Sequence, residues 1–211
     1  FVDSDKGNIL AVGGNIPGWA WTEAASQLSA RFDYKIKLEN DANCAAECEA
    51  WLGAGSALHS FVMLTIGTGL GGAVWFPKTG LWKGANYRAA EFGHSILWPG
   101  GRGCSCGQKG CAEGYISGSA IQKNYYDITG TETDGNTIVD LYWRDDSAKL
   151  AVDRFSDDLG TFLVTLRNIL DPEGFIIGGG VSESRTIWWD RMIESFMNRV
   201  NDATSDRKSV V

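Results

Sequence analysis

The residues best suited to hold a metal ion are one histidine and three cysteines in a glycine-rich stretch. They are His94, Cys104, Cys106 and Cys111, spaced as H-x9-C-x-C-x4-C. Such a set fills the four positions of a tetrahedral zinc ion and leaves none open, which is typical of a structural site. The alternative is three free cysteines beside an unrelated histidine, but thiols so close together are liable to oxidation. The pattern therefore predicts a structural Zn²⁺ that holds this loop in place.

Two glycine-rich segments could bring backbone NH groups to the phosphates of a nucleotide. The first joins two predicted strands and contains Gly67, Thr68, Gly69, Gly71 and Gly72. The second follows a predicted strand, precedes a helix and consists of Gly178, Gly179 and Gly180. Glycine lets the backbone approach a ligand closely, and the start of a helix presents unpaired NH groups to an anion. Each segment taken alone is equally consistent with an ordinary glycine-rich turn.

Three acidic residues and one asparagine stand at positions where chemistry is often found. Asn40 and Asp41 lie where a predicted strand ends and a helix begins, a common place for active-site residues in α/β proteins. Glu91 and Glu113 flank the metal ligands, so folding around the ion would fix both carboxylates. Carboxylates held in this way suit a polyhydroxylated substrate, because each can accept hydrogen bonds from hydroxyl groups. The alternatives are a helix N-cap for the first pair and ordinary surface acids for the two glutamates.

The elements that must position these residues alternate between strands and helices. Short apolar or alternating runs predict strands, and longer stretches with a 3.6-residue period predict helices. The predicted strands are 7–12, 34–38, 61–66, 73–76 and 175–177, and the predicted helices are 20–31, 45–52, 113–126, 136–143, 149–170 and 185–200. Residues 77–112 lack periodicity and need a device such as the zinc site to order them. The pattern indicates an α/β fold with a mixed sheet and helices on both faces.

Composition limits the kinds of binding partner and the cellular compartment that fit this chain. The net charge of −7, with no long basic run, disfavours nucleic acid as a partner. No apolar run reaches about 18 residues, the length of a membrane span, and the start has no signal-peptide pattern. An odd number of cysteines, five, with three packed together indicates metal ligation in a reducing cytoplasm rather than disulfides. Cys44 and Cys48, four residues apart in a helical pattern, are interpreted as small core residues.

Taken together, the motifs resemble the ROK family (repressors, open reading frames, kinases), a branch of the actin-like and hexokinase ATPase superfamily. The matching stretches come in family order over nearly the whole chain: residues 38–44 (LENDANC), 66–72 (IGTGLGG), 91–94 (EFGH), 104–113 (CSCGQKGCAE) and 177–180 (IGGG). The resemblance implies an actin-like, ribonuclease H-like fold. It also implies ATP-dependent phosphorylation of the 6-hydroxyl of a hexose or N-acetylhexosamine, with Mg²⁺ accompanying the ATP.

The resemblance assigns a role to each residue of the sugar site. Asp41 would be the general base that takes the proton from the 6-hydroxyl as it attacks the γ-phosphate. Asn40 would hydrogen-bond the sugar, and Glu91 and Glu113 would bind further hydroxyls. His94 would bind the sugar through one ring nitrogen and zinc through the other, which fixes its tautomer.

The resemblance extends to the nucleotide and to a second sugar-binding segment. Residues 67–72 would receive the phosphates of ATP, and residues 178–180 would lie on its adenosine side. Asn15 belongs to residues 14–19 (GNIPGW), which are similar to a sugar-side segment of the family.

The chain also departs from the family pattern. Kinases of the family begin with an Asp-x-Gly-Gly-Thr phosphate loop, and the 211 residues hold no such segment. We therefore expect residues 1–37 to be the remnant of a small N-terminal lobe and residues 38–211 to be the large lobe, cut from a longer protein. Since this loop supplies half of the contacts that hold the phosphates of ATP, we expect the 211-residue chain alone to be inactive.

Three functions stay open at this point: a sugar kinase, a sugar-responsive transcriptional repressor without its DNA-binding domain, and a non-catalytic sugar-binding module. Repressors of the family tend to lose the Asn of the Asn–Asp pair and to blur the Gly-Thr-Gly loop, and both are intact here. The kinase is therefore favoured, with N-acetylglucosamine or glucose as the sugar. We expect a cytoplasmic homodimer that binds a sugar and ATP.

Overall fold

A computed structural model of the chain describes residues 1–11 and 17–200. The N-terminal part holds β1 (Val2–Asp3), β2 (Asn8–Ile9) and α1 (Ala24–Phe32). The central sheet and its helices follow: α2 (Asp41–Leu52), β3 (Phe61–Ile66), β4 (Leu70–Phe76), β5 (Gly80–Leu81), α3 (Gly118–Thr129), α4 (Gly135–Leu141), α5 (Asp146–Leu170), β6 (Gly174–Gly178) and α6 (Trp189–Met197). Short 3-10 helices lie at Ala54–Ala57, Phe92–His94, Ala112–Gly114 and Gly180–Ile187.

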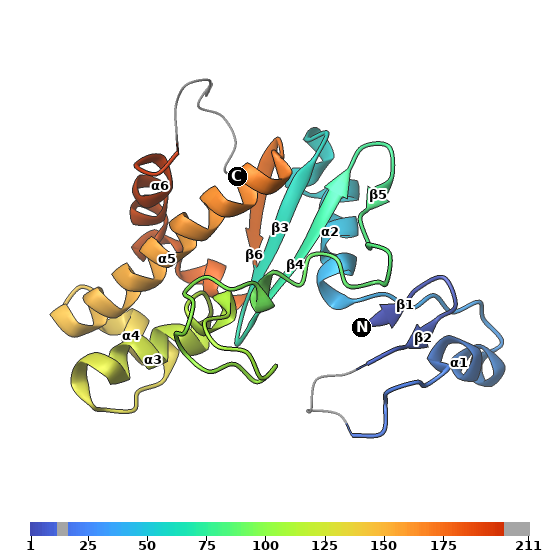
Figure 1. Cartoon of the computed structure of the whole chain (residues 1–211), viewed down its shortest axis with the longest axis horizontal. Coiled ribbons are helices and arrows are strands. Elements are labelled where there is room, and N and C mark those ends of the chain that lie inside the picture. The colour runs from blue at the N-terminus through green and yellow to red at the C-terminus, as the bar shows by residue number, and fades with distance from the viewer. Residues whose placement is uncertain (12–16, 201–211) are drawn as a thin grey trace.

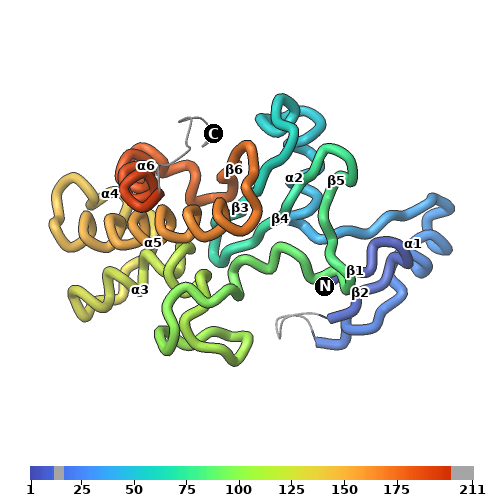
Figure 2. The backbone as a smooth tube through the Cα atoms, turned by 45° about the horizontal axis from the view of Figure 1, so that its top comes forward, coloured from blue at the N-terminus to red at the C-terminus, as the bar shows by residue number. Residues whose placement is uncertain are grey.

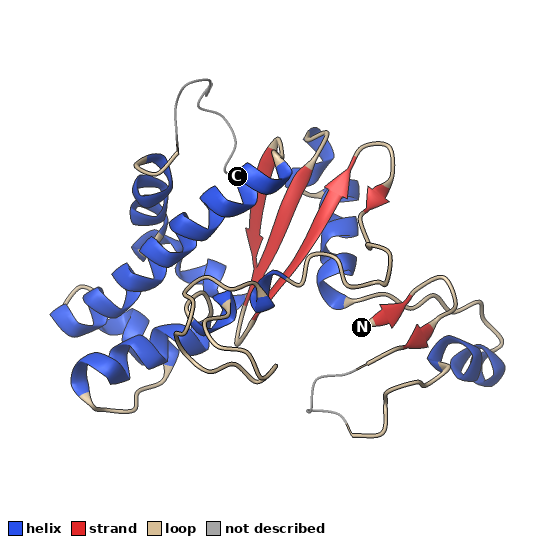
Figure 3. Ribbon diagram, viewed as in Figure 1, coloured by secondary structure: helices blue, strands red, loops and turns tan. Residues whose placement is uncertain are grey.

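The main sheet is mixed, as predicted. Its strand order is β5-β4-β3-β6, with β3 and β4 forming an antiparallel hairpin and β6 pairing parallel to β3 (Figure 3). The parallel pair requires the chain to cross over between β3 and β6, and α3, α4 and α5 lie in that connection. Consequently the ends of β3 and β6 meet at one edge of the sheet, where the two glycine-rich segments begin.

Helices cover both faces of the sheet, because strand β3 is apolar on both of its sides. Successive side chains of a strand point to opposite faces. Phe61 and Met63 pack with Ala46 of α2, whereas Leu64 and Ile66 join a larger core with α3, α5 and α6. In Figure 1, α2 lies on one side of the strands and α5 on the other. A continuous apolar run such as residues 61–66 fits a strand that is buried on both faces.

The long helix α5 organises the larger core. Asp145 caps its start by accepting a hydrogen bond from the backbone NH of Ser147 (2.8 Å), and Asp171 ends it in the left-handed region. Its buried face carries Phe155, whose ring meets the ring of fully buried Trp188 edge-on at 5.8 Å. No helix within residues 1–11 and 17–200 combines the length and apolar character that a membrane crossing requires.

Several predicted elements need correction. Residues 34–38 are not a strand: none of the described strands lies beside them, and alternation without a hydrogen-bonding neighbour does not make a sheet. The predicted strand 7–12 shortens to Asn8–Ile9, and part of it lies outside the described residues. The helix predicted from 113 begins at Gly118, after a 3-10 turn, and the one predicted from 185 begins at Trp189.

The interpretation of Cys44 and Cys48 as core residues is wrong. Both are exposed on α2. Helix α2 turns Ala42 and Ala46 toward the sheet, and residues two positions later fall on the opposite side of a helix with 3.6 residues per turn.

Candidate active site

The start of α2 fixes the Asn40–Asp41 pair. Asn40 is the N-cap: its Oδ1 accepts hydrogen bonds from the backbone NH groups of Ala42 (2.9 Å) and Asn43 (3.2 Å). Because the cap uses the amide oxygen, the Nδ2 group is the part of the side chain left to meet a ligand, and it can only donate. Asp41 is exposed in the first helical turn, where the helix dipole favours a negative charge. The N-cap alternative for Asn40 is thus confirmed, and it leaves a donor for a substrate.

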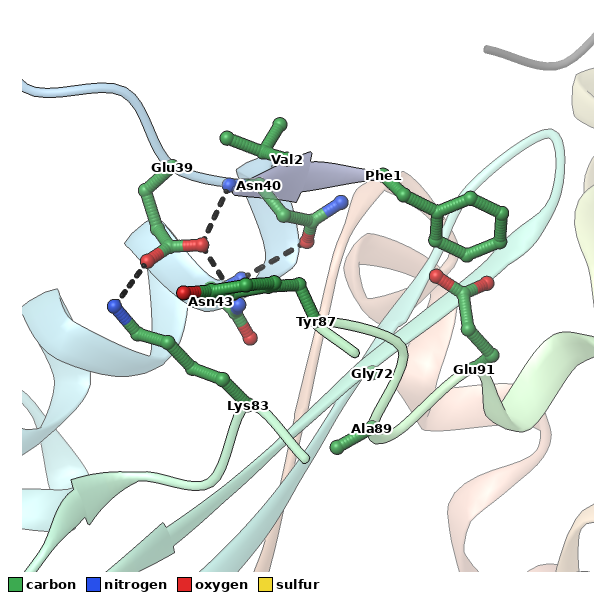
Figure 4. A pocket seen from close by; sticks show the side chains of 10 residues that line it. All are labelled: Phe1, Val2, Glu39, Asn40, Asn43, Gly72, Lys83, Tyr87, Ala89 and Glu91. Carbon is green, nitrogen blue, oxygen red and sulfur yellow. Dashed lines mark hydrogen bonds and ion pairs between the residues drawn. The ribbon is translucent and has the colours of Figure 1, made fainter. Parts of the chain in front are cut away.

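A small cleft opens beside this helix start. Its lining comes from the N-terminal strand, the start of α2, β4 and the segment after β5: Phe1, Val2, Glu39, Asn40, Asn43, Gly72, Lys83, Tyr87, Ala89 and Glu91 (Figure 4). Asn40 and the carboxylate of Glu91 stand on opposite sides of the opening, with the ring of Phe1 above Glu91. The cleft thus joins two of the residues predicted to bind a sugar.

Glu91 is held in an unusual electrostatic environment. Its side chain stays exposed at the rim, yet the surrounding protein removes enough water to raise the pKa of its carboxyl above the usual range. The charge of Asp41 raises this pKa further, while His94 and Arg88 act in the opposite direction. Glu91 therefore lies in a partly desolvated site in which the negative charge of Asp41 also acts on its carboxyl.

The predicted metal ligands lie together. The ligand atoms of His94, Cys104, Cys106 and Cys111 are all within 4.8 Å of one another. Cys104 Sγ lies 3.6 Å from His94 Nδ1, and Cys106 Sγ lies 3.6 Å from Cys111 Sγ. Two thiolates that each bind a tetrahedral zinc at about 2.3 Å are roughly 3.8 Å apart, so the residues fit a zinc ion in spacing and in type.

The loop that carries these ligands is a tight hairpin. The NH of Cys104 donates to the carbonyl oxygen of Gln108 (2.9 Å), and the NH of Gly107 donates to that of Cys104 (3.0 Å). Gly107 has a φ of 89°, which favours glycine there. Hydrogen bonds from Gln108 lower the pKa of Cys106 to about 6, which favours the thiolate that a metal needs. Burial raises the pKa of Cys111 to about 12, a direction that a bound cation would reverse.

Glu113 connects the cysteine loop with the β3–β4 hairpin. It follows Cys111 in a short 3-10 helix, and its Oε2 accepts a hydrogen bond from the backbone NH of Leu70 (3.1 Å). A side chain at Gly69 would collide with the same carboxylate oxygen, which explains the glycine. The metal loop and the first glycine-rich segment are therefore one connected unit.

The turn between β3 and β4 is fixed to the start of α3. The NH of Gly67 donates to the carbonyl oxygen of Gly69 (3.0 Å), and the NH of Gly118 donates to that of Gly67 (2.7 Å). The hydroxyl of Ser119 donates to the carbonyl oxygen of Thr68 (2.8 Å), and Thr68 itself is exposed. Thr68 and the turn thus form a rigid, solvent-facing rim.

Gly71 and Gly72 lie inside strand β4 rather than in the turn. A side chain at Gly71 would collide with the hydroxyl of Thr65, and one at Gly72 would collide with the ring of Phe92. Close packing accounts for both glycines, independently of any ligand.

The second glycine-rich segment lies next to the first. Gly178 pairs with Thr65 at the end of β6. Gly179 has a φ of 90°, and a Cβ on it would come within 2.5 Å of the carbonyl oxygen of Ile66. Gly180 then begins a 3-10 helix. The two segments meet where β3 and β6 end, the position at which open α/β sheets bind ligands.

Sequence reasoning also missed residues that line the cleft. Glu39, Asn43, Lys83 and Tyr87 belong to its wall, and Glu39 forms an ion pair with Lys83 (2.9 Å). The charged residue directly before the Asn–Asp pair was the only available signal. Asn15 lies outside the described residues.

Comparison with known proteins assigns the chain to a family. The sequence profile of the ROK family matches residues 1–211, and the chain belongs to that family. It is 33% identical over 191 residues to an N-acetyl-D-glucosamine kinase of Shigella boydii, covering 85% of this chain and 62% of the relative. It is 32% identical over 214 residues to a glucokinase of Thermotoga maritima, covering 94% and 67%.

A solved relative has the same fold. The crystal structure of a ROK family glucokinase from Streptomyces griseus, in complex with glucose and AMPPNP, superposes with a TM-score of 0.87 at 29% identity. The match covers 100% of this chain and 73% of that one. The expected actin-like, ribonuclease H-like fold is thereby confirmed. The chain spans less than two thirds of the Shigella relative, 62% of its length.

Proposed function

We propose that the protein is an ATP-dependent sugar kinase that phosphorylates the 6-hydroxyl of a hexose or N-acetylhexosamine. The observation that carries this proposal is the cleft in which Asn40 and Glu91 face each other, with Asp41 following Asn40 at the start of α2. Such an arrangement offers one donor and several acceptors to a polyhydroxylated ligand. The relatives named as N-acetyl-D-glucosamine kinase and glucokinase support the same reaction.

Asp41 acts as general base in this proposal. The 6-hydroxyl oxygen attacks the γ-phosphorus of ATP, its proton passes to the Asp41 carboxylate, and the bond from that phosphorus to the β–γ bridging oxygen breaks to release ADP. Asn40 donates through Nδ2 to a sugar oxygen, and the carboxylates of Glu91 and Glu113 accept from sugar hydroxyls. Holding the hydroxyl in line with the phosphate supplies most of the catalysis.

The glycine-rich rim serves the nucleotide. We assign the turn at Gly67, Thr68 and Gly69 to the phosphates and Gly178, Gly179 and Gly180 to the adenosine side, because both meet at the sheet edge. Gly71 and Gly72 contribute by packing beneath the site. Mg²⁺ bound with ATP would neutralise phosphate charge. The 211 residues do not contain the Asp-x-Gly-Gly-Thr loop, which supplies half of the phosphate-binding contacts in the family.

We also propose that His94, Cys104, Cys106 and Cys111 hold a structural Zn²⁺. The distances among their ligand atoms support it, and the set leaves no open position for catalysis. The ion would hold the cysteine loop, and through Glu113 it would steady the β3–β4 turn.

We propose a division into a small lobe, residues 1–37, and a large lobe, residues 38–211. Both core clusters are drawn entirely from residues after 37, which supports the boundary. The cytoplasmic location and the homodimer remain part of the same proposal.

The test is a coupled ADP-release assay on the complete gene product. N-acetylglucosamine, glucose, N-acetylmannosamine and fructose are offered separately, and we expect the first or second to give the highest kcat/KM. Sugar binding by calorimetry with no ADP release above background would contradict the kinase and would favour a sugar-responsive repressor or a sugar-binding module.

A further inference from the structure

One carboxylate beside the proposed catalytic pair, that of Glu39, spends most of its hydrogen-bonding capacity on the protein itself. Oε1 of Glu39 accepts hydrogen bonds from the backbone NH of Asn40 (2.9 Å) and from the side-chain amide of Asn43 (3.0 Å). Its Oε2 forms an ion pair with Nζ of Lys83 (2.9 Å). Figure 4 shows this set on one wall of the cleft, next to the amide of Asn40. A carboxylate with three partners from the chain itself is poorly suited to bind a substrate hydroxyl and well suited to hold its neighbours.

Lys83 extends this arrangement to the N-terminal region. It follows β5, and its Nζ donates to the hydroxyl of Ser4 (2.6 Å) as well as bonding Glu39. Both charged side chains are partly shielded, with 32% of Lys83 and 18% of Glu39 exposed. Charge-assisted hydrogen bonds in such surroundings are stronger than those between fully exposed groups. The ion pair therefore ties the start of α2 to the segment after β5 and to the N-terminal hairpin.

The bonds of Glu39 are distinct from the cap of the helix. Asn40 caps α2 through its own side chain, and the first-turn NH groups of Ala42 and Asn43 are satisfied without Glu39. Glu39 instead fixes the peptide unit between residues 39 and 40. The orientation of this unit sets the direction in which the side chains of Asn40 and Asp41 project. Burial alone would raise the pKa of Glu39, but the bonds from Asn43, Asn40 and Lys83 outweigh it and lower the pKa, so the carboxylate is charged at neutral pH.

We infer that Glu39, held by Lys83, is a positioning residue that orients Asn40 and Asp41 for phosphoryl transfer. The inference rests on the proposed sugar kinase activity. Positioning of this kind has a large kinetic effect, because a displacement of about 1 Å can cost roughly 10²-fold in rate. The inference predicts that replacing Glu39 changes mainly kcat, because Glu39 does not contact the sugar.

The experiment compares Glu39→Ala, Glu39→Gln and Lys83→Met in the complete gene product. We expect Glu39→Ala to lower kcat by about 10- to 100-fold with at most a few-fold change in the KM for the sugar. Gln keeps an oxygen for the NH of Asn40, so Glu39→Gln should recover activity to within about fivefold of wild type. Lys83→Met removes only the support on Oε2 and leaves the bonds of Oε1 to Asn40 and Asn43, so its loss of activity should also stay within about fivefold. Glu47→Ala, which removes an exposed carboxylate elsewhere on α2, is the matched control.

A second readout needs no substrate. Hydrogen exchange of the Asn40 amide should quicken in Glu39→Ala and stay slow in Glu39→Gln and Glu47→Ala, at unchanged melting temperature. An Asn40 amide unaffected by Glu39→Ala, or a kcat equal to that of Glu47→Ala, would overturn the inference. A raised KM with normal kcat in both Glu39 variants would overturn it in favour of direct sugar binding. A wild-type protein that turns over none of the sugars would contradict the proposed function instead, and amide exchange would still decide the role of Glu39.

Discussion

Residues 1–37 and residues 38–200 are built in different ways. The later region contains both hydrophobic cores, with side chains such as Phe61, Phe155 and Trp188 almost fully buried. Among the described residues of the first region, Ile9 and Ala25 are the buried apolar side chains, whereas Trp21 is 79% and Tyr34 74% exposed. In Figure 2 the first region lies beyond β5, at the opposite end of the molecule from α3 and α4.

The difference shows where the proposed chemistry is anchored. Asp41, Glu91 and Glu113 stand on elements fixed by the cores or by the cysteine loop, while the first region adds Phe1 and Val2 to the cleft wall. Polar contacts connect the two regions, among them the hydrogen bonds from Lys83 to Ser4 and from Tyr87 to Asp5. Polar surface contacts rearrange at small cost compared with a packed core. The later region should therefore determine catalysis and stability, and the first should modulate them.

The largest effect should come from the proposed base. We expect Asp41→Asn to lower kcat of the complete gene product by about 10²–10⁴-fold, because the general base is lost, while the affinity for the sugar is largely kept. Turnover by ADP release and affinity by calorimetry measure the two quantities. Near-normal turnover would remove Asp41 from the role.

Loss of a metal ligand should have the next largest effect. We expect Cys106→Ser to abolish stoichiometric zinc and to lower the melting temperature by about 5–10 °C, because the loop from His94 to Cys111 has little core of its own. Cys48→Ser, at an exposed cysteine of α2, is the matched control. Elemental analysis showing no zinc in the wild type, or an unchanged melting curve for Cys106→Ser, would refute the assignment.

The two glutamates should have a moderate effect on sugar binding. We expect Glu91→Gln or Glu113→Gln to weaken binding by about 1–3 kcal/mol, or roughly 5- to 150-fold in Kd, the range for hydrogen bonds to charged groups. Titration calorimetry measures it, with exposed Glu194→Gln as the control. Unchanged affinity in both variants would mean that these acids serve only the fold.

The smallest effect concerns the contact between the two regions. The hydrogen bond from Tyr87 to Asp5 raises the pKa of Tyr87 to about 12, because the neutral phenol is the donor. The bond therefore contributes at all pH values below the ordinary tyrosine pKa and is lost as the pH rises through about 12. In an ultraviolet titration, Asp5→Ala should return the pKa of Tyr87 toward the usual tyrosine value. If the titration curve does not change, the two regions are not joined at this contact.

Local patterns in the sequence predicted much of the fold but not all of it. The apolar runs at 61–66 and 175–177 predicted β3 and β6, since strands covered on both faces need no alternation. The alternating pattern of residues 34–38 wrongly predicted a strand, because alternation carries no information about a pairing partner. The ligands His94 to Cys111 could be found because they are close in sequence. The Glu39–Lys83 pair could not, because the fold brings its members together from distant positions.

The central claim is that the γ-phosphoryl group of ATP is transferred to a sugar 6-hydroxyl. A label on that phosphoryl group tests this transfer most directly. The complete gene product is incubated with ATP labelled on the γ-phosphate and with glucose or N-acetylglucosamine, and the 6-deoxy analogue of each serves as control. We predict a labelled sugar 6-phosphate from at least one of the two sugars and none from the analogues. Binding of the sugar without transfer of label, or transfer to a 6-deoxy analogue, would contradict the account.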